Sequence, residues 1–162
     1  MPRACVSLLF AVLALDVGAC ASYDSRWHAA AAAKQEDPYA GAWTGRWVSK
    51  KHRGEGDKLR CILTPETDEA ASDGEKVYRA DFEAHWLKVF SSTHSVMLHV
   101  QPLKKPEGES AGVSGLAFAG TSALNTIVGK GTYHCEGMMT PTKMGAHYDA
   151  TYDTGLFELG RP

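Results

Sequence analysis

The chain has 162 residues, of which 44% are hydrophobic and 22% are charged. This balance is typical of a globular protein, and the length suits one domain with a modest core. The net charge is −2 and the isoelectric point is about 6.4, so the basic surface that usually accompanies nucleic-acid binding is missing and no such partner is predicted. Sixteen glycines against seven prolines indicate many turns and close backbone approaches, as in all-β folds.

The first residues have the organisation of an export signal. Arg3 and the amino terminus supply positive charge, and the twelve apolar residues 4–15 follow. That run is too short to cross a hydrocarbon core of about 30 Å as a helix, but it has the length of a signal-peptide core. The next segment, Val17-Gly18-Ala19-Cys20, resembles the lipobox of bacterial lipoproteins, in which the cysteine receives diacylglycerol before cleavage. The resemblance implies a signal peptide over residues 1–19 and lipidation of Cys20.

Secretion without a lipid is the lesser alternative. Asp16 lies unusually close to the lipobox, and Ala19-Cys20-Ala21 also fits the A-x-A pattern of ordinary secretory cleavage. Both alternatives export the domain. In the lipoprotein family an aspartate after the cysteine favours the inner membrane, so Ala21 implies the outer membrane. We therefore expect a membrane-anchored lipoprotein of the cell envelope.

Residues 20–38 are predicted to form the lipidated N-terminus and a tether. Ser25 can cap a short helix that continues through five alanines to Glu36, because alanine favours helix. Asp37-Pro38 ends it, since the residue before proline avoids the α region. The segment shows no apolar stripe wide enough to dock firmly, so a semi-rigid spacer containing Trp27 and His28 is expected. The alternative is a partner helix close to the membrane.

From residue 39 to the end, apolar residues recur with a period of two, which indicates strands with one buried face. Eight such segments lie around residues 41–51, 58–64, 78–86, 96–101, 116–118, 133–135, 148–152 and 157–159. Turn-like sequences connect them, and none is long enough for a crossover helix. The prediction is all-β: an eight-stranded antiparallel up-and-down barrel over residues 39–162, since closure removes the free edges.

The two ends of this domain are similar to those of the calycins, which include lipocalins, fatty-acid-binding proteins and avidins. The domain opens with Gly41-Ala42-Trp43, repeats this as Gly45-Arg46-Trp47, and ends with Arg161. In lipocalins a basic residue near the end of the last strand packs across the first tryptophan, which implies that Arg161 closes the barrel over Trp43 or Trp47. The chain also resembles uncharacterised exported bacterial proteins with a GxWxGxW start and a DxGxFxLxR end. That resemblance implies no activity.

Seven aromatic residues are candidates for the wall of a ligand pocket: Trp47, Tyr78, Phe82, Trp86, Tyr133, Tyr148 and Tyr152. An eight-stranded barrel either packs shut or holds one small ligand. Two functions therefore remain open: a binding or carrier module for a small apolar or amphipathic ligand, and a structural or protein-interaction lipoprotein with a packed barrel. Cys61 and Cys135 also leave two alternatives, a disulfide in an oxidising compartment or two buried thiols.

One group of histidines is a weak metal candidate. If Tyr133 and Tyr148 face inward, a hairpin register with the right parity places His134 opposite His147 on the outer face. Imidazoles with neighbouring carboxylates can hold Zn²⁺, but such groups are also common on solvated sheet faces. No H-x-H, HExxH or CxxC spacing supports a site, and nucleophile-elbow, P-loop and dinucleotide motifs are missing. The expectation is therefore a protein with no enzymatic activity, no metal and no cofactor.

Overall fold

The computed structural model describes residues 22–51, 57–67, 75–86, 90–103, 115–126 and 129–162, with only the backbone at Trp86, Thr126 and Gly129. The predicted signal peptide, the lipobox and Cys20 lie outside the described residues. The elements in chain order are α1 (Tyr23–Ala32), β1 (Gly41–Ser49), β2 (Lys58–Glu66), β3 (Lys76–Trp86), β4 (Phe90–Pro102), β5 (Leu116–Thr126), β6 (Gly129–Met139), β7 (Lys143–Ala150) and β8 (Thr154–Gly160).

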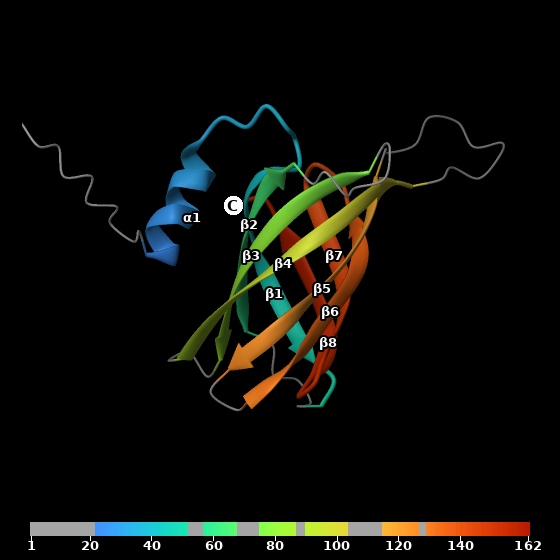
Figure 1. Cartoon of the computed structure of the whole chain (residues 1–162). Helices are drawn as coiled ribbons and strands as arrows, with labels where there is room; N and C mark the ends of the chain where they lie inside the picture. The colour runs from blue at the N-terminus through green and yellow to red at the C-terminus, as the bar shows by residue number, and fades with distance from the viewer. Residues whose placement is uncertain (1–21, 52–56, 68–74, 87–89, 104–114, 127–128) are drawn as a thin grey trace, which may run out of the picture.

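The eight strands form a closed barrel (Figure 1). Each strand pairs antiparallel with the next, and β8 returns to pair with β1, from Thr44 opposite Gly160 to Ser49 opposite Gly155. The predicted eight-stranded antiparallel up-and-down barrel is confirmed. Closure leaves the sheet without unpaired edge strands, and a single sheet can then enclose a core without a second sheet.

The period of two in the sequence decides which side chains fill the barrel. In β4, Val96, Leu98 and Val100 are at most 2% exposed, whereas Met97 between them is 38% exposed. Among the strands that are longer than the alternation predicts, β4 starts at Phe90 and β5 runs on to Thr126. Their additional segments, 91–95 and 121–125, are mostly polar, so they carry no hydrophobic alternation that a sequence pattern could detect.

Arg161 and Trp43 close one end of the barrel, here called the closed end, where the C-terminus also lies (Figure 1). The guanidinium carbon of Arg161 lies 3.9 Å from the centre of the Trp43 ring, and Trp43 is fully buried. The contact expected between Arg161 and either Trp43 or Trp47 is therefore present, and its partner is Trp43. The guanidinium also donates hydrogen bonds to four backbone carbonyls, those of Pro38, Ala40, Ala42 and Pro141.

The helix α1 packs against the outside of the barrel, so the prediction of a spacer that does not dock is wrong. Trp27 is 8% exposed and lies in a cluster with Ala42 and Ile62, on the outer face of β1 and β2. Its indole nitrogen donates a hydrogen bond to the Trp43 carbonyl at 3.1 Å. Trp27 is the buried residue of α1, and a single aromatic anchor leaves no continuous apolar stripe in the sequence of a helix.

Charged residues complete this interface beneath the helix. Arg60 on β2 is 7% exposed and binds Asp24 of α1 at 2.7 Å and Glu83 of β3 at 2.6 Å. Its guanidinium lies 5.5 Å from the ring of Tyr23 and 5.2 Å from that of Trp27, so the cation also contacts two aromatic faces. Outward-facing residues of β2 and β3 are therefore buried because α1 covers them.

Candidate ligand site in the open half of the barrel

The barrel wall is not continuously paired between β4 and β5. These strands pair only from Leu98 opposite Gly120 to Pro102 opposite Leu116. By contrast, β3 and β4 pair along most of their length, from Lys76 opposite Val100 to Trp86 opposite Phe90. Residues 90–97 of β4 and 121–126 of β5, here called the seam, therefore make no ladder with each other. Figure 1 shows yellow-green β4 and orange β5 separating toward the lower end, opposite the closed end.

Gly120 lies where the pairing of the two strands ends, and the strands approach each other closely there. A Cβ atom at this position would lie 2.5 Å from the Met97 carbonyl oxygen and 2.8 Å from a methyl group of Val96. Only glycine permits so close an approach without a shift of the backbone. The strands therefore touch at Gly120 and pair on one side of it.

The part of the barrel on the seam side of Gly120 is here called the open half. Three of its inward side chains, those of His94, Ser122 and Leu124, are half-buried, whereas Val96 and Leu98 toward the closed end are at most 2% exposed. The inward residues of this half include Trp47, Ala84, His94, Ser122, Leu124, Tyr133, Tyr148 and Ala150. Among the described residues, the interior is thus fully buried toward the closed end and partly exposed along the seam.

A row of aromatic rings crosses this part of the interior. Phe82 stacks on His94 with ring centres 5.2 Å apart, and His94 contacts Tyr133 at 4.6 Å. Tyr133 in turn stacks on Tyr148 at 6.1 Å with 14° between the planes, and Tyr148 meets the edge of Trp47 at 6.5 Å. The row, here called the aromatic row, runs from β3 through β4, β6 and β7 to β1.

Two buried polar atoms beside this row have no hydrogen-bond partner. They are Nε2 of His94 and Oγ of Ser122, from the two strands that flank the seam. Both neighbour Tyr133, His94 through its ring and Ser122 as the residue paired with Tyr133 in the sheet. An unpaired buried polar group costs about 1–3 kcal/mol, so a bound molecule that pairs with these two atoms would recover that cost.

The site is uncharged near neutral pH. Burial lowers the pKa of His94 to about 4, so the imidazole is neutral and carries one donor and one acceptor nitrogen. Burial also raises the pKa of Tyr133 well above its usual value. The Tyr148 hydroxyl donates to Asp153 at 2.7 Å, and the same carboxylate accepts from Ser49 at 2.7 Å. Asp153 thus holds the mouth of the barrel at the turn between β7 and β8.

Four of the seven aromatic candidates, Trp47, Phe82, Tyr133 and Tyr148, lie in the aromatic row. Tyr78 is also interior, but it lies at the closed end, where its hydroxyl donates to Asp37 at 2.6 Å. The side chain of Trp86 lies outside the described residues.

The inward orientation expected for Tyr152 is wrong. Its side chain is 41% exposed and its hydroxyl donates to the Lys130 carbonyl at 2.9 Å. The physical reason is that β7 ends at Ala150, so the alternation of faces stops two residues before Tyr152.

His94 and Ser122 are absent from the sequence-based candidates. Both lie in the polar segments where the alternation is lost. A signal did exist, because His94 is in phase with the buried residues Val96, Leu98 and Val100 of the same strand. Extending that phase by one step would have placed a histidine inside the barrel.

Of the two alternatives for the cysteines, the structure has buried thiols. Cys61 and Cys135 are both fully buried inside the barrel and neither forms a disulfide. Burial raises the pKa of Cys135 to about 12 and that of Cys61 well above its usual value. Because the thiolate is the reactive form, these cysteines behave as small apolar core residues.

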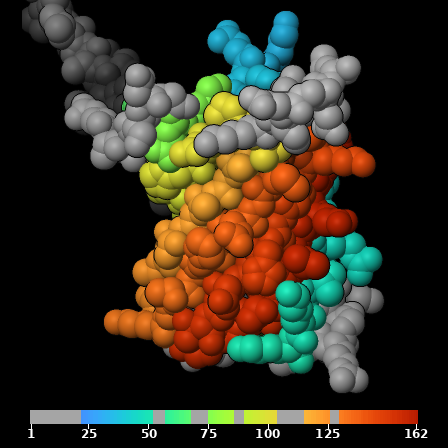
Figure 2. Space-filling model, turned by 90° about the vertical axis from the view of Figure 1, so that its right-hand side faces the viewer, coloured from blue at the N-terminus to red at the C-terminus, as the bar shows by residue number. Residues whose placement is uncertain are grey.

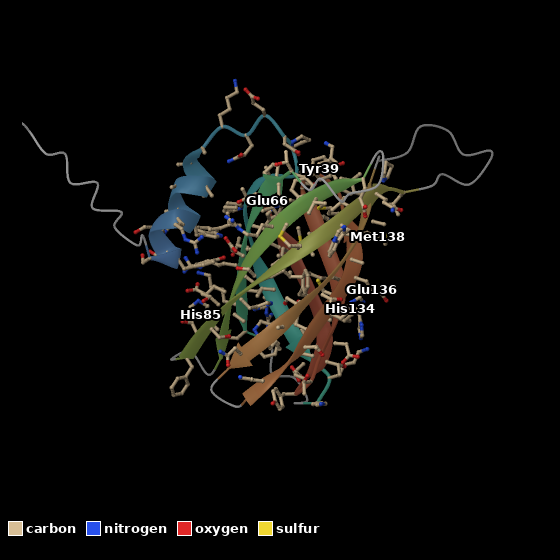
Figure 3. The ribbon with its side chains drawn as sticks, in the orientation of Figure 1. Tyr39, Glu66, His85, His134, Glu136 and Met138 are labelled. Atoms are coloured by element: carbon tan, nitrogen blue, oxygen red, sulfur yellow. The ribbon has the colours of Figure 1, made fainter. Side chains whose placement is uncertain are left out.

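The expected register of His134 opposite His147 is wrong by two residues. His134 lies opposite Asp149, and Glu136 lies opposite His147, although all four remain on the outer face as the parity requires. Figure 3 shows His134 and Glu136 together on the outside of the barrel. The turn fixes this register, because the backbone N–H of Thr140 donates to the Lys143 carbonyl at 2.7 Å. Within the described ranges, no group of three or more His, Cys, Asp or Glu side chains is placed to hold a metal ion.

The outer face of β4 to β7 carries a shallow recess. Its lining includes His99, Ala117, Glu136, Met138 and His147, and Met138 is 60% exposed. Figure 2 shows the face of the molecule formed by the later, orange and red strands. The recess belongs to the outer surface and is separate from the aromatic row, which lies inside the barrel.

No protein-family model, curated protein or solved structure matches the chain. In the part of the chain that the structure describes, no helix is both long and apolar enough to cross a membrane. Fold and site together therefore define a closed eight-stranded antiparallel barrel with one helix docked outside. One end is closed by an arginine–tryptophan contact, and the other half holds an aromatic row with two unpartnered polar atoms.

Proposed function

We propose that the protein is a non-enzymatic, membrane-anchored lipoprotein of the cell envelope that binds a small amphipathic ligand in the open half of its barrel. The observation that carries the proposal is the seam. Because β4 and β5 stop pairing at Gly120, the interior beyond this point is bounded at the seam by partly exposed side chains rather than by a continuous ladder. Ligand sites usually combine apolar and aromatic walls with a few placed polar groups, and the aromatic row supplies such walls.

The architecture supports the same reading. A calycin-like barrel has one closed end and one open end, and the Arg161–Trp43 contact occupies a single end here. The lipobox resemblance at Cys20 supports the membrane anchor, most simply at the outer membrane. Under this proposal the lipid holds the domain at the membrane surface, where amphipathic molecules concentrate.

A second candidate function is a structural or protein-interaction lipoprotein with a packed barrel. It is favoured by the dense core toward the closed end, where Trp43, Tyr78, Leu98 and Met139 are at most 1% exposed. Such a protein would bind its partners through its outer surface and would leave the interior without a guest.

Titration with an apolar fluorescent probe, N-phenyl-1-naphthylamine, separates the two functions. We expect saturable binding at one site, lost in Leu124→Trp, which fills the open half from an inward position. Ala123→Trp adds the same ring at the neighbouring outward position and serves as the matched control. Equal probe binding by both variants, or no saturable binding by the wild type, would favour the packed barrel. Thermal unfolding of each variant checks that the fold is retained.

A further inference from the structure

We infer that the ligand of the open half is an uncharged molecule with a flat ring and a hydroxyl or carbonyl group, which hydrogen-bonds to His94 Nε2 and Ser122 Oγ. This inference rests on the proposed function and adds the chemical class of the ligand. It is carried by the two enclosed polar atoms and by the chemistry of the residues around them.

The polar part of the ligand follows from what the two atoms can exchange. A neutral imidazole nitrogen either donates or accepts, and a serine hydroxyl does both. A hydroxyl on the ligand also donates and accepts, so it can satisfy both atoms whichever tautomer His94 adopts. A carbonyl satisfies them when both side chains donate. A purely apolar guest would leave both atoms unpaired and would keep their desolvation cost.

The absence of charge on the ligand follows from the lining. Along the described parts of the eight strands, the inward positions of the open half carry no Asp, Glu, Lys or Arg; Lys76, which is in phase with the inward residues of β3, lies at the closed end and pairs with Asp37. The buried ionic residues Arg60, Asp81 and Glu83 lie on the opposite, outer face beneath α1. Asp153 at the mouth already accepts hydrogen bonds from Tyr148 and Ser49. An ionised ligand would therefore be buried without a counter-charge, which is strongly unfavourable.

The flat ring follows from the aromatic row. Tyr133 and Tyr148 are nearly parallel, and His94 lies against Tyr133, so their faces offer stacking surfaces beside the two polar atoms. The small side chains of Ala84 and Ala150 are only partly buried at the same level. A planar ring has contact area on both faces and can stack in such a setting at little conformational cost. The low pKa of His94 agrees with this ligand class, because a neutral imidazole gains nothing from an anion.

Three probes with the same ring system test the inference on the purified full-length protein: 2-naphthol, naphthalene and 2-naphthalenesulfonate. We expect the wild type to bind 2-naphthol about tenfold more tightly than naphthalene, and the sulfonate more weakly than naphthalene. The double variant His94→Phe/Ser122→Ala keeps the ring stack, so the naphthol preference should fall to about one while naphthalene still binds. Retained naphthalene binding also shows that the variant is folded, and Ser122→Ala alone should lose part of the preference.

Thr93→Val is the matched control, because Thr93 precedes His94 in β4 and faces outward, so its loss should leave the naphthol preference unchanged. The inference is overturned if the wild type binds naphthol and naphthalene equally, if it prefers the sulfonate, or if the double variant keeps the preference. In each of these results the proposed binding function still stands. A wild type that binds none of the three probes overturns the proposed function as well, so the two failures are distinguishable.

Discussion

His94 links the interior of the barrel to the pH of its surroundings. Burial beside Phe82 and Tyr133 lowers its pKa from 6.5 to about 4. The unfolded chain therefore takes up this proton near pH 6.5, and the folded chain does so only near pH 4. Stability is full above pH 6.5 and decreases as the pH falls from 6.5 toward 4, by roughly 2–3 kcal/mol.

Denaturant unfolding at pH 7, 5.5 and 4.5 measures this dependence. We expect His94→Phe to flatten the profile in this window, because the substituted chain has no proton to take up at this position. His28→Gln, which changes an exposed histidine on α1, is the control and should follow the wild type. The assignment to His94 is wrong if His94→Phe loses as much stability on acidification as the wild type.

Arg161 is the second residue whose removal has a defined consequence. Arg161→Ala should lower the free energy of unfolding by about 2–4 kcal/mol, since it removes a cation over the Trp43 face and the donors to several buried carbonyls. Denaturant unfolding measures the loss. Glu158→Ala, at an exposed outward position of β8, should stay within about 0.5 kcal/mol of the wild type. An equally small change in the free energy of unfolding for Arg161→Ala would show that Arg161 does not stabilise the closed end.

These two residues show what sequence reasoning can and cannot locate. The Arg161–Trp43 contact could be predicted because closure brings the first and last strands together, whatever the details of the wall. His94 and Ser122 could not be found in the same way, because their neighbours are polar on both faces. Tyr152 failed for a related reason, since the alternation was continued past the end of its strand.

At the level of elements, α1 depends on the barrel. A helix of ten residues is marginal alone in water, so its persistence here rests on Trp27 and the ion pairs of Arg60. Trp27→Ala should detach α1: its backbone amides should exchange at least tenfold faster with solvent, while amides of β6 and β7 keep their protection. His28→Ala, next in sequence but exposed, is the matched control. Unchanged exchange in α1 of the Trp27 variant would contradict this account of docking.

The close approach of β4 and β5 at Gly120 leads to a prediction about these two strands. Gly120→Ala places a methyl group against the Met97 carbonyl, so we expect a loss of roughly 1–3 kcal/mol in denaturant unfolding. Gly145→Ala is the control, because the nearest atom to its added methyl group is 3.8 Å away. Equal effects of the two substitutions would mean that β5 does not approach the backbone of β4 as closely at Gly120 as the structure has it.

The strands themselves were predictable in number, order and facing, because the period of two and the turn residues are local signals. Register was not. Parity decides which face a residue occupies, but registers that differ by two residues share that parity, and the turn chooses between them. In the β6–β7 hairpin the Thr140–Lys143 hydrogen bond makes that choice, which separates His134 from His147.

On the scale of the whole molecule, the barrel combines three regions. Arg161 closes one end, α1 covers part of the outer wall, and the open half on the far side of Gly120 has partly exposed inward side chains along the seam. A protein that must hold its shape and still admit a guest benefits from this separation, because the packing that stabilises the fold lies away from the candidate site. The helix α1 itself, Tyr23–Ala32, lies against the barrel.

The last prediction concerns the lipid anchor expected at Cys20. If Cys20 carries the lipid, cells fed radiolabelled palmitate should label the wild type, and the protein should fractionate with membranes. Cys20→Ala should abolish the label, and the protein should move to the soluble fraction or remain as an unprocessed precursor, because the acyl chains supply the binding energy at about 0.8 kcal/mol per buried CH₂. Cys135→Ala is the matched control, since this thiol is buried in the barrel and should not affect labelling. A Cys20→Ala variant that is processed and fractionates like the wild type would refute the anchor and leave secretion without a lipid, and the barrel would then meet its ligand in solution.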